Sequence, residues 1–175
     1  MPPPAPIPVH ARASTSGGPA LRCEIAAGMQ APFRDAWPVV TDEPRALGGT
    51  AAAPPPLVLM AAALAGCLAT QLRAFARPHG IALTHVAVTA DLRWHGERQA
   101  DGTTRARPEG IDIDIGLAGD APPERLVDLT MAAARGCYVE ALVDPAIPLR
   151  HRLTLGGTRM RLPDPRDAAP AGGRA

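Results

Sequence analysis

A long apolar stretch at residues 57–72 restricts what this chain can fold into more than any other feature. Fourteen of its sixteen residues are apolar or glycine. Its first half would be apolar on every side of a helix, which predicts burial on all sides. Pro54–Pro56 suit a helix entry, and Pro78 marks its end. Because a membrane span needs about 20 apolar residues, and polar residues begin at Thr70, we expect the core helix of a soluble, cytoplasmic protein without a membrane segment.

Alternating apolar and polar residues predict strands before and after this helix. The predicted strands are 11–16, 21–25, 86–94, 111–117 and 147–155, with room for a short one at 37–40. Residues 96–110 read as a polar hairpin loop. A second helix is expected after Asp120, its N-cap. Asp112 and Asp114 are expected on a solvated face. Strands adjacent in sequence favour antiparallel pairing, so the predicted fold class is α+β rather than a doubly wound sheet.

Composition limits the domain organisation and the partners. Residues 1–9 hold five prolines and are expected to be disordered, residues 10–156 to form a single domain, and residues 157–175 to be a flexible tail. The net charge is +1, without a basic block. This balance lacks the electrostatic footprint of a nucleic-acid-binding protein, so no nucleic-acid partner is expected.

The chain has three cysteines, Cys23, Cys67 and Cys137, at wide spacings. These spacings provide no close metal-ligand pair, so neither a metal site nor a disulfide scaffold is expected. A buried cysteine is often only a small core residue, and Cys23 is interpreted in this way. Cys137 follows Gly136 at the start of a predicted helical turn, a position that favours a thiolate, and Arg135 adds positive charge there.

Two segments around the other cysteines carry a resemblance to a known family. PPPLVLMAAALAGC at 54–67 places a cysteine on the apolar helix, and AAARGCYVEAL at 132–142 places a second one after a helix. With EPRALGG at 43–49, these segments resemble the OsmC/Ohr family, that is, osmotically inducible protein and organic hydroperoxide resistance protein. The resemblance covers about residues 9–156. It implies an OsmC-like fold, with antiparallel sheets packed around a long buried central helix, in an intertwined homodimer.

The resemblance also implies a thiol-dependent peroxidase. Cys67 would match the peroxidatic cysteine, which attacks an organic hydroperoxide and becomes a sulfenic acid. Cys137 would match the resolving cysteine, which closes a disulfide with it. A dithiol reductant, such as a lipoylated protein, would restore both thiols, and no cofactor is expected. The apolar helix would give a bulky hydroperoxide an apolar wall.

Family members place an arginine beside the reactive thiolate, and three positions here could supply it. Arg45, in the segment before the apolar helix, is the preferred candidate for this catalytic role. Arg22 and Arg34 remain as alternatives.

The sequence departs from the family at the glutamate that orients this arginine. Leu57 and Val58 stand at the matching places, and no acidic residue lies between Glu43 and Cys67. Two hypotheses therefore stay open. The first is a two-cysteine peroxidase, which retention of both cysteines favours. The alternative is a non-enzymatic OsmC-like protein that binds an apolar or electrophilic small molecule, which the absent glutamate favours.

Overall fold

The computed structural model describes residues 9–15, 21–30 and 33–167. Their contacts form two compact units, Met1–Met60 and Ala61–Ala175, and the division falls inside the long helix. The sequence predicted one domain over residues 10–156, whereas the internal contacts separate at that helix. Nearly all of the predicted disordered segment, residues 1–9, lies outside the described residues.

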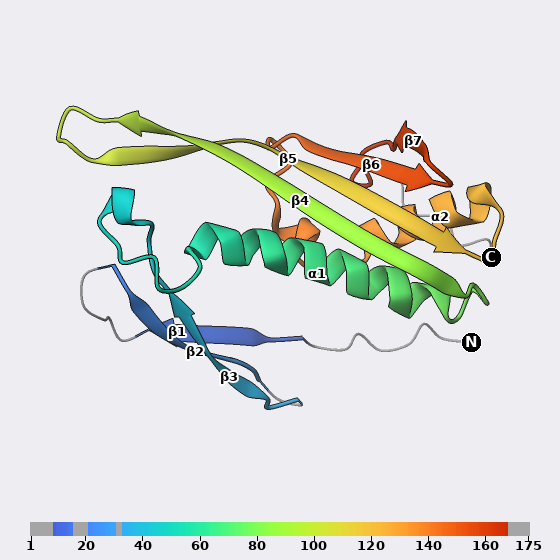
Figure 1. The fold of residues 1–175 in the computed structure, drawn as a ribbon, viewed down its shortest axis with the longest axis horizontal. Coiled ribbons are helices and arrows are strands. Elements are labelled where there is room, and N and C mark those ends of the chain that lie inside the picture. The colour runs from blue at the N-terminus through green and yellow to red at the C-terminus, as the bar shows by residue number, and fades with distance from the viewer. Residues whose placement is uncertain (1–8, 16–20, 31–32, 168–175) are drawn as a thin grey trace. The chain divides into compact units, whose positions relative to one another are not determined.

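The first unit contains a small antiparallel sheet (Figure 1). Its strands are β1 (Ala11–Thr15), β2 (Cys23–Met29) and β3 (Ala36–Thr41), in that spatial order. The short strand predicted at 37–40 is therefore confirmed as β3. A 3-10 turn, η1 (Arg45–Leu47), follows before α1 (Pro56–Ala76) begins.

The second unit is built on a four-stranded sheet in the order β4-β5-β6-β7 (Figure 1). The strands are β4 (Leu83–Arg98), β5 (Thr104–Gly119), β6 (Leu149–Leu155) and β7 (Thr158–Arg161). The predicted loop at 96–110 is wrong, because β4 and β5 stay paired as far as Arg98 and Thr104. Between β5 and β6 the chain forms α2 (Pro123–Arg135) and the 3-10 turn η2 (Glu140–Leu142).

One strand pair in this sheet corrects the expectation of antiparallel pairing. β5 and β6 are parallel, from Ile111 opposite Leu149 to Leu117 opposite Leu155. The helix between them explains the difference, since a helical crossover returns the chain to the same end of the sheet. The predicted N-cap is also wrong. Pro122 is the N-cap of α2, while the Asp120 carboxylate accepts a hydrogen bond from the Ala82 amide at 2.8 Å.

The two helices and the sheet share one apolar core. Alternate residues of β5 and β6 face it, together with the apolar stripes of α1 and α2. Its fully buried large apolar side chains are Leu64, Leu68, Leu72, Ile113, Ile115 and Leu153. The α1 stripe repeats every four residues, so it marks only one face of that helix.

One chain by itself does not bury α1 on all sides. Leu57 and Val58 are 54% and 53% exposed, and Met60 is also exposed. The helix is long and apolar enough to cross a membrane by length and composition, with 17% of its most apolar window buried. Because the Leu64, Leu68 and Ala76 side of the helix lies in the core of the second unit, we interpret α1 as a domain helix with one uncovered apolar face.

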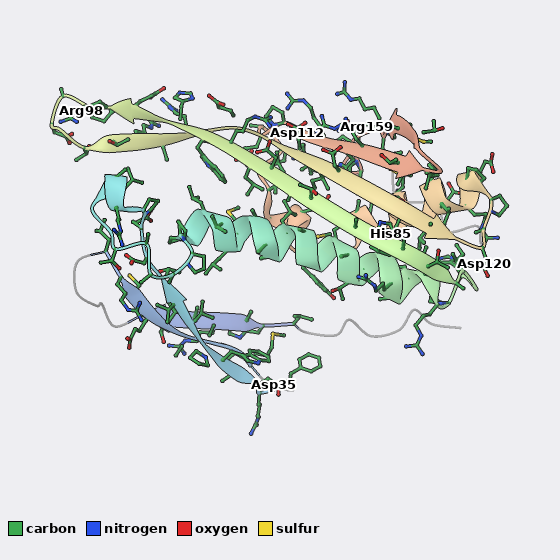
Figure 2. All side chains as sticks on the ribbon, in the orientation of Figure 1. Asp35, His85, Arg98, Asp112, Asp120 and Arg159 are labelled. Atoms are coloured by element: carbon green, nitrogen blue, oxygen red, sulfur yellow. The ribbon has the colours of Figure 1, made fainter. Side chains whose placement is uncertain are left out.

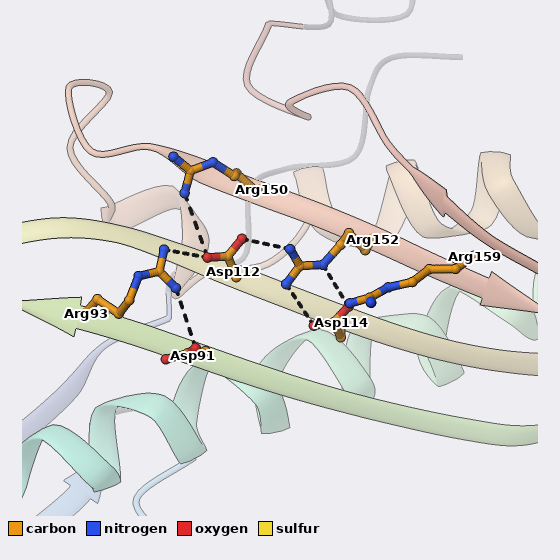
Figure 3. A network of polar contacts seen from close by, with 7 residues as sticks. All are labelled: Asp91, Arg93, Asp112, Asp114, Arg150, Arg152 and Arg159. Carbon is orange, nitrogen blue, oxygen red and sulfur yellow. Dashed lines mark hydrogen bonds and ion pairs between the residues drawn. The ribbon is translucent and has the colours of Figure 1, made fainter.

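The opposite face of the sheet carries an ion-pair network rather than isolated solvated aspartates (Figure 3). The Asp112 carboxylate lies 2.5 Å from the Arg93 guanidinium and 3.2 Å from that of Arg152, and only 9% of its side chain is exposed. Asp114 pairs with Arg152 at 2.9 Å and with Arg159. Figure 2 shows Asp112 and Arg159 on the side of the sheet away from α1. The expected solvated face is therefore wrong for Asp112.

Ordered chain also continues past residue 156, where the sequence predicted a flexible tail. β7 pairs antiparallel with β6, and Leu162 is buried beyond it. The Arg166 guanidinium then donates to the backbone carbonyls of Asp144 and Ile147 at 3.2 and 3.1 Å. The hydrogen bonds of a sheet edge and one buried leucine fix residues 158–167, and the rest of the predicted tail lies outside the described residues.

Acid should remove the contribution of this network to stability. Hydrogen bonds from Arg152 and Arg159 hold the pKa of Asp114 at about 2, below its ordinary 3.8. A lowered folded-state pKa stabilises the fold above the ordinary value, and this stabilisation is lost as pH falls from about 4 towards 2. We expect Asp114→Asn to cost up to about 1 kcal/mol at pH 7, because the site is partly exposed, and clearly less at pH 2.5.

Urea unfolding of the wild type and Asp114→Asn at both pH values measures this difference. Asp128→Asn, at an exposed position on α2, is the matched control. An Asp114→Asn penalty that is as large at pH 2.5 as at pH 7 would contradict the ion-pair explanation.

Candidate active site

Cys67 lies in the middle of α1, directly before Leu68 of the buried stripe. Its side chain is half-buried and packs against the core of the second unit. The helical rotation of about 100° per residue turns it towards the edge of the stripe rather than its centre. The thiol therefore borders the apolar core.

Cys137 is placed by the end of α2. Gly136 closes that helix, and the Cys137 amide donates to the Ala134 carbonyl at 3.1 Å. The Cys137 carbonyl in turn accepts from the Ala141 amide at 3.1 Å, which opens the turn containing η2. The side chain is 1% exposed and belongs to the same core cluster that Cys67 touches.

The two thiols are neighbours, although seventy residues separate them in sequence. Burial raises the pKa of Cys137 to about 12, and the side chain and charge of Cys67 contribute in the same direction. A backbone amide of Glu140 opposes them by hydrogen bonding the sulfur. The prediction that the position of Cys137 favours its thiolate is therefore wrong, because the effect of burial on the pKa outweighs that of the amide at the helical turn. All three cysteines are free thiols.

A close contact between α1 and the end of α2 supports the proximity of Cys67 and Cys137. A Cβ atom added to Gly136 would lie 2.6 Å from the ring of Phe75 on α1, which is closer than side-chain carbons approach. Gly136 has a φ of −87°, so its need for glycine is spatial rather than conformational. The missing side chain lets Phe75 of α1 pack against the backbone next to Cys137.

Sequence reasoning missed a buried ion pair beside Cys137. The Glu140 Oε2 atom lies 3.0 Å from His151 Nε2, with side chains 3% and 1% exposed. In the described part of the chain, neither Glu140 Oε1 nor His151 Nδ1 has a hydrogen-bond partner. The available signal was the polar residue in CYVEAL and a histidine at an inward position of an alternating strand. Buried polar atoms without a partner are rare in folded proteins and call for an explanation.

The predicted arginine belongs to the first unit, whereas both cysteines belong to the second. Arg45 is exposed in η1, and its Nε donates to the Thr50 carbonyl at 3.3 Å. Of the alternatives, Arg22 is half-buried just before β2, and Arg34 is exposed at a positive φ of 60°. The role of Arg45 stays a prediction, and so does the core role of Cys23, which is half-buried.

The loop that carries Arg45 is fixed by a buried carboxylate. Asp42 accepts the backbone amides of Glu43, Thr50 and Ala52 at 2.9, 3.2 and 3.1 Å, and also the Thr50 hydroxyl. The Thr50 hydroxyl and these amides hold the pKa of Asp42 at about 2. Such an arrangement gives the loop a defined shape without a regular element.

Among the described residues, no group of three or more His, Cys, Asp or Glu side chains is placed to hold a metal ion. The polar groups near the thiols are able to exchange protons. They comprise one carboxylate, one imidazole and the Cys137 sulfur with its amide donor.

The described residues form an α+β protein with a long helix, two sheets and two cysteines at one apolar core. A family model for OsmC-like protein matches residues 48–152. The chain therefore belongs to the OsmC-like protein family. Among curated proteins, none matches the chain.

Solved structures agree with this assignment. An OsmC-like hydroperoxide resistance protein from a Jannaschia species is 33% identical, with a TM-score of 0.50 over 88% of this chain and 97% of that one. An organic hydroperoxide resistance protein OsmC from Legionella pneumophila shares 17% identity, with a TM-score of 0.62 over 83% and 97%. A Vibrio cholerae protein, described as a putative organic hydroperoxide resistance protein with captopril bound in one active site, shares 18% identity, with a TM-score of 0.61 over 91% and 99%.

The contact between Gly136 and Phe75 can be tested by restoring the side chain. We expect Gly136→Ala to cost about 1–3 kcal/mol, as overpacking does in a filled core. Adding Phe75→Leu, which removes the ring, should recover part of that loss. Urea unfolding of both single variants and the double variant forms a double-mutant cycle. Strictly additive penalties would show that the two positions do not interact.

Proposed function

We propose that this protein is a thiol-dependent peroxidase for organic hydroperoxides, in which Cys67 and Cys137 are the redox pair. The observation that carries the proposal is the meeting of these two thiols at one apolar core. Membership of the OsmC-like family and similarity to hydroperoxide resistance proteins support it. Disulfide closure requires two thiols that can approach each other, and both cysteines lie at the same apolar core.

The proposed cycle balances in three steps. The Cys67 thiolate attacks the hydroxyl oxygen of the hydroperoxide, the O–O bond breaks, and the alkoxide leaves and takes a proton from water. Cys67 is then a sulfenic acid. The Cys137 sulfur attacks it, the S–S bond forms and the oxygen leaves as water. A dithiol reductant, such as a lipoylated protein, then reduces the disulfide by thiol–disulfide exchange. This step restores both cysteine thiols and oxidises the reductant. Arg45 is the proposed stabiliser of the Cys67 thiolate, and the proposed location is the cytoplasm.

Binding without turnover is the second candidate function. No acidic residue occupies the positions between Glu43 and Cys67 where the family glutamate is expected. The Vibrio cholerae protein is described with a small molecule bound in one active site. On this proposal, the same apolar site binds an apolar or electrophilic compound, and Cys67 is not oxidised during its function.

Cysteine variants separate the two candidates. We expect reduced wild-type protein to consume cumene hydroperoxide and to form a Cys67–Cys137 disulfide, detected by peptide mass spectrometry. Cys67→Ser should remove consumption. Cys137→Ser should form the sulfenic acid, trapped by dimedone, and stop after a single turnover. Cys23→Ser is the matched control and should behave like the wild type. Equal consumption by Cys67→Ser, or no sulfenic acid in the wild type, would reject the peroxidase.

We also propose that the protein is a homodimer. The exposed apolar start of α1, at Leu57, Val58 and Met60, is the kind of surface that a second copy covers. Light scattering after size exclusion should give twice the monomer mass of 18.1 kDa. Val58→Glu should shift the mass towards the monomer, because it places a charge on this face. A wild-type mass of one chain at micromolar concentration would exclude a stable dimer.

A further inference from the structure

We propose that Glu140 accepts the proton of the Cys137 thiol as the disulfide with Cys67 closes, and that His151 positions the Glu140 carboxylate for this transfer. This inference rests on the proposed peroxidase function and assigns a base to its second step. Glu140 would be a catalytic residue of that step, since it would take the proton directly from the reacting cysteine. His151 would act only through Glu140.

The second step requires a base because of where Cys137 lies. Its thiol is 1% exposed, and burial raises its pKa to about 12. At neutral pH, such a thiol is almost entirely protonated. The thiolate is the nucleophile that forms a disulfide. Closure at a useful rate therefore needs a neighbouring group that takes the proton during the attack.

Glu140 is a buried carboxylate close to Cys137 in the chain. It stands three residues after Cys137 in the same turn, and its backbone amide donates a hydrogen bond to the Cys137 sulfur. Its side chain is buried, with Oε2 bonded to His151 and Oε1 without a partner among the described residues. A buried acceptor left unpaired normally costs free energy. Its presence beside a buried thiol is explained if the free oxygen accepts the thiol proton.

His151 fixes the carboxylate from β6. The 3.0 Å contact joins His151 Nε2 to Glu140 Oε2. Because an ionised carboxylate only accepts hydrogen bonds, we assign the proton of a neutral imidazole to Nε2. His151 Nδ1 then carries a lone pair, and a doubly protonated ring would instead bury an unpaired N–H there. The contact with His151 thus orients Glu140 through Oε2 and leaves Oε1 available.

Other charged groups reach this pair from the segment after β7. Arg166 and Asp164 form an ion pair at 2.6 Å. Asp164 is the main cause of the raised pKa of Arg166, to which the Glu140 charge adds. Hydrogen bonds from Arg166 in turn lower the pKa of Asp164. With Cys67 from α1, these are the titratable and charged groups that act on Glu140 and His151.

The step is balanced without a further reactant. The Cys137 sulfur forms a bond to the Cys67 sulfur, and the S–O bond of the Cys67 sulfenic acid breaks. The proton leaves Cys137 for Glu140 and is then delivered to the departing hydroxide, which becomes water. The hydroperoxide of the first step is the oxidant, and Glu140 ends the step as the carboxylate it was at the start.

Rapid mixing of the reduced full chain with cumene hydroperoxide tests this assignment. The hydroperoxide is set high enough for sulfenic acid to form faster than the disulfide closes. Dimedone trapping then follows the first step, and acid quenching with thiol alkylation follows the second. For Glu140→Gln we expect an unchanged first step and closure at least about tenfold slower at pH 7. Its closure rate should rise about tenfold per pH unit, as hydroxide replaces the lost base, whereas the wild-type rate should be nearly constant from pH 7 to 9.

Two further variants separate catalysis from structure. Glu109→Gln removes a carboxylate of a comparable but exposed pair, in which Glu109 lies 2.8 Å from His95. This variant should form the disulfide at the same rate as the wild type. His151→Gln should slow closure less than Glu140→Gln and keep the flat pH profile, because the base remains.

The outcomes distinguish this inference from the function on which it rests. Absence of sulfenic acid in the wild type would reject the peroxidase and the inference with it. Sulfenic acid followed by equally fast closure in wild type and Glu140→Gln would overturn the inference alone. If circular dichroism shows that Glu140→Gln does not fold, the wild-type profile decides. A nearly constant closure rate supports an internal base, and a rate rising tenfold per pH unit overturns it.

Discussion

The interaction on which the site depends is the packing of one stripe of α1 into the core of the second unit. Leu64, Leu68 and Leu72 enter the cluster that also contains the inward residues of β5 and β6. Cys67 is one residue away from that stripe, so the same packing sets its depth. Cys137 reaches the cluster from the end of α2. If this packing were lost, the two sulfurs would no longer be held close together, because seventy residues separate them along the chain.

Burial also sets the chemistry at this place. The apolar surroundings that bring the thiols together disfavour a thiolate at Cys137, as its raised pKa shows. The nearby polar groups are few and mostly enclosed: a backbone amide on the sulfur and the pair of Glu140 with His151. A site of this type depends on a small number of well-placed donors and acceptors, since each acts more strongly in a low dielectric. The ion pairs on the opposite face, in contrast, lie partly in solvent and hold strands together (Figure 3).

Local patterns were reliable wherever one element decided the outcome. The helix after Pro54–Pro56, the alternating strands and the turn after Gly136 are all present. The predictions failed where contacts between distant segments determine the structure. The parallel pairing of β5 and β6 follows from the crossover through α2, and the order past residue 156 follows from pairing of β7 with β6. The apolar character of α1 was correctly recognised, but periodicity cannot tell which of its faces the chain itself covers.

Residue types at fixed spacings along the chain were enough to predict the family, the α+β class and the two cysteines that matter for the proposed chemistry. The folded chain was needed to show that the Cys137 thiol is buried deeply enough for its pKa to rise, and that Glu140 and His151 form a buried pair near it. The physical reason is that burial and hydrogen-bond partners are properties of the space around a side chain. That space is created by segments from α1, α2, β6 and the chain after β7, which no local pattern relates to one another.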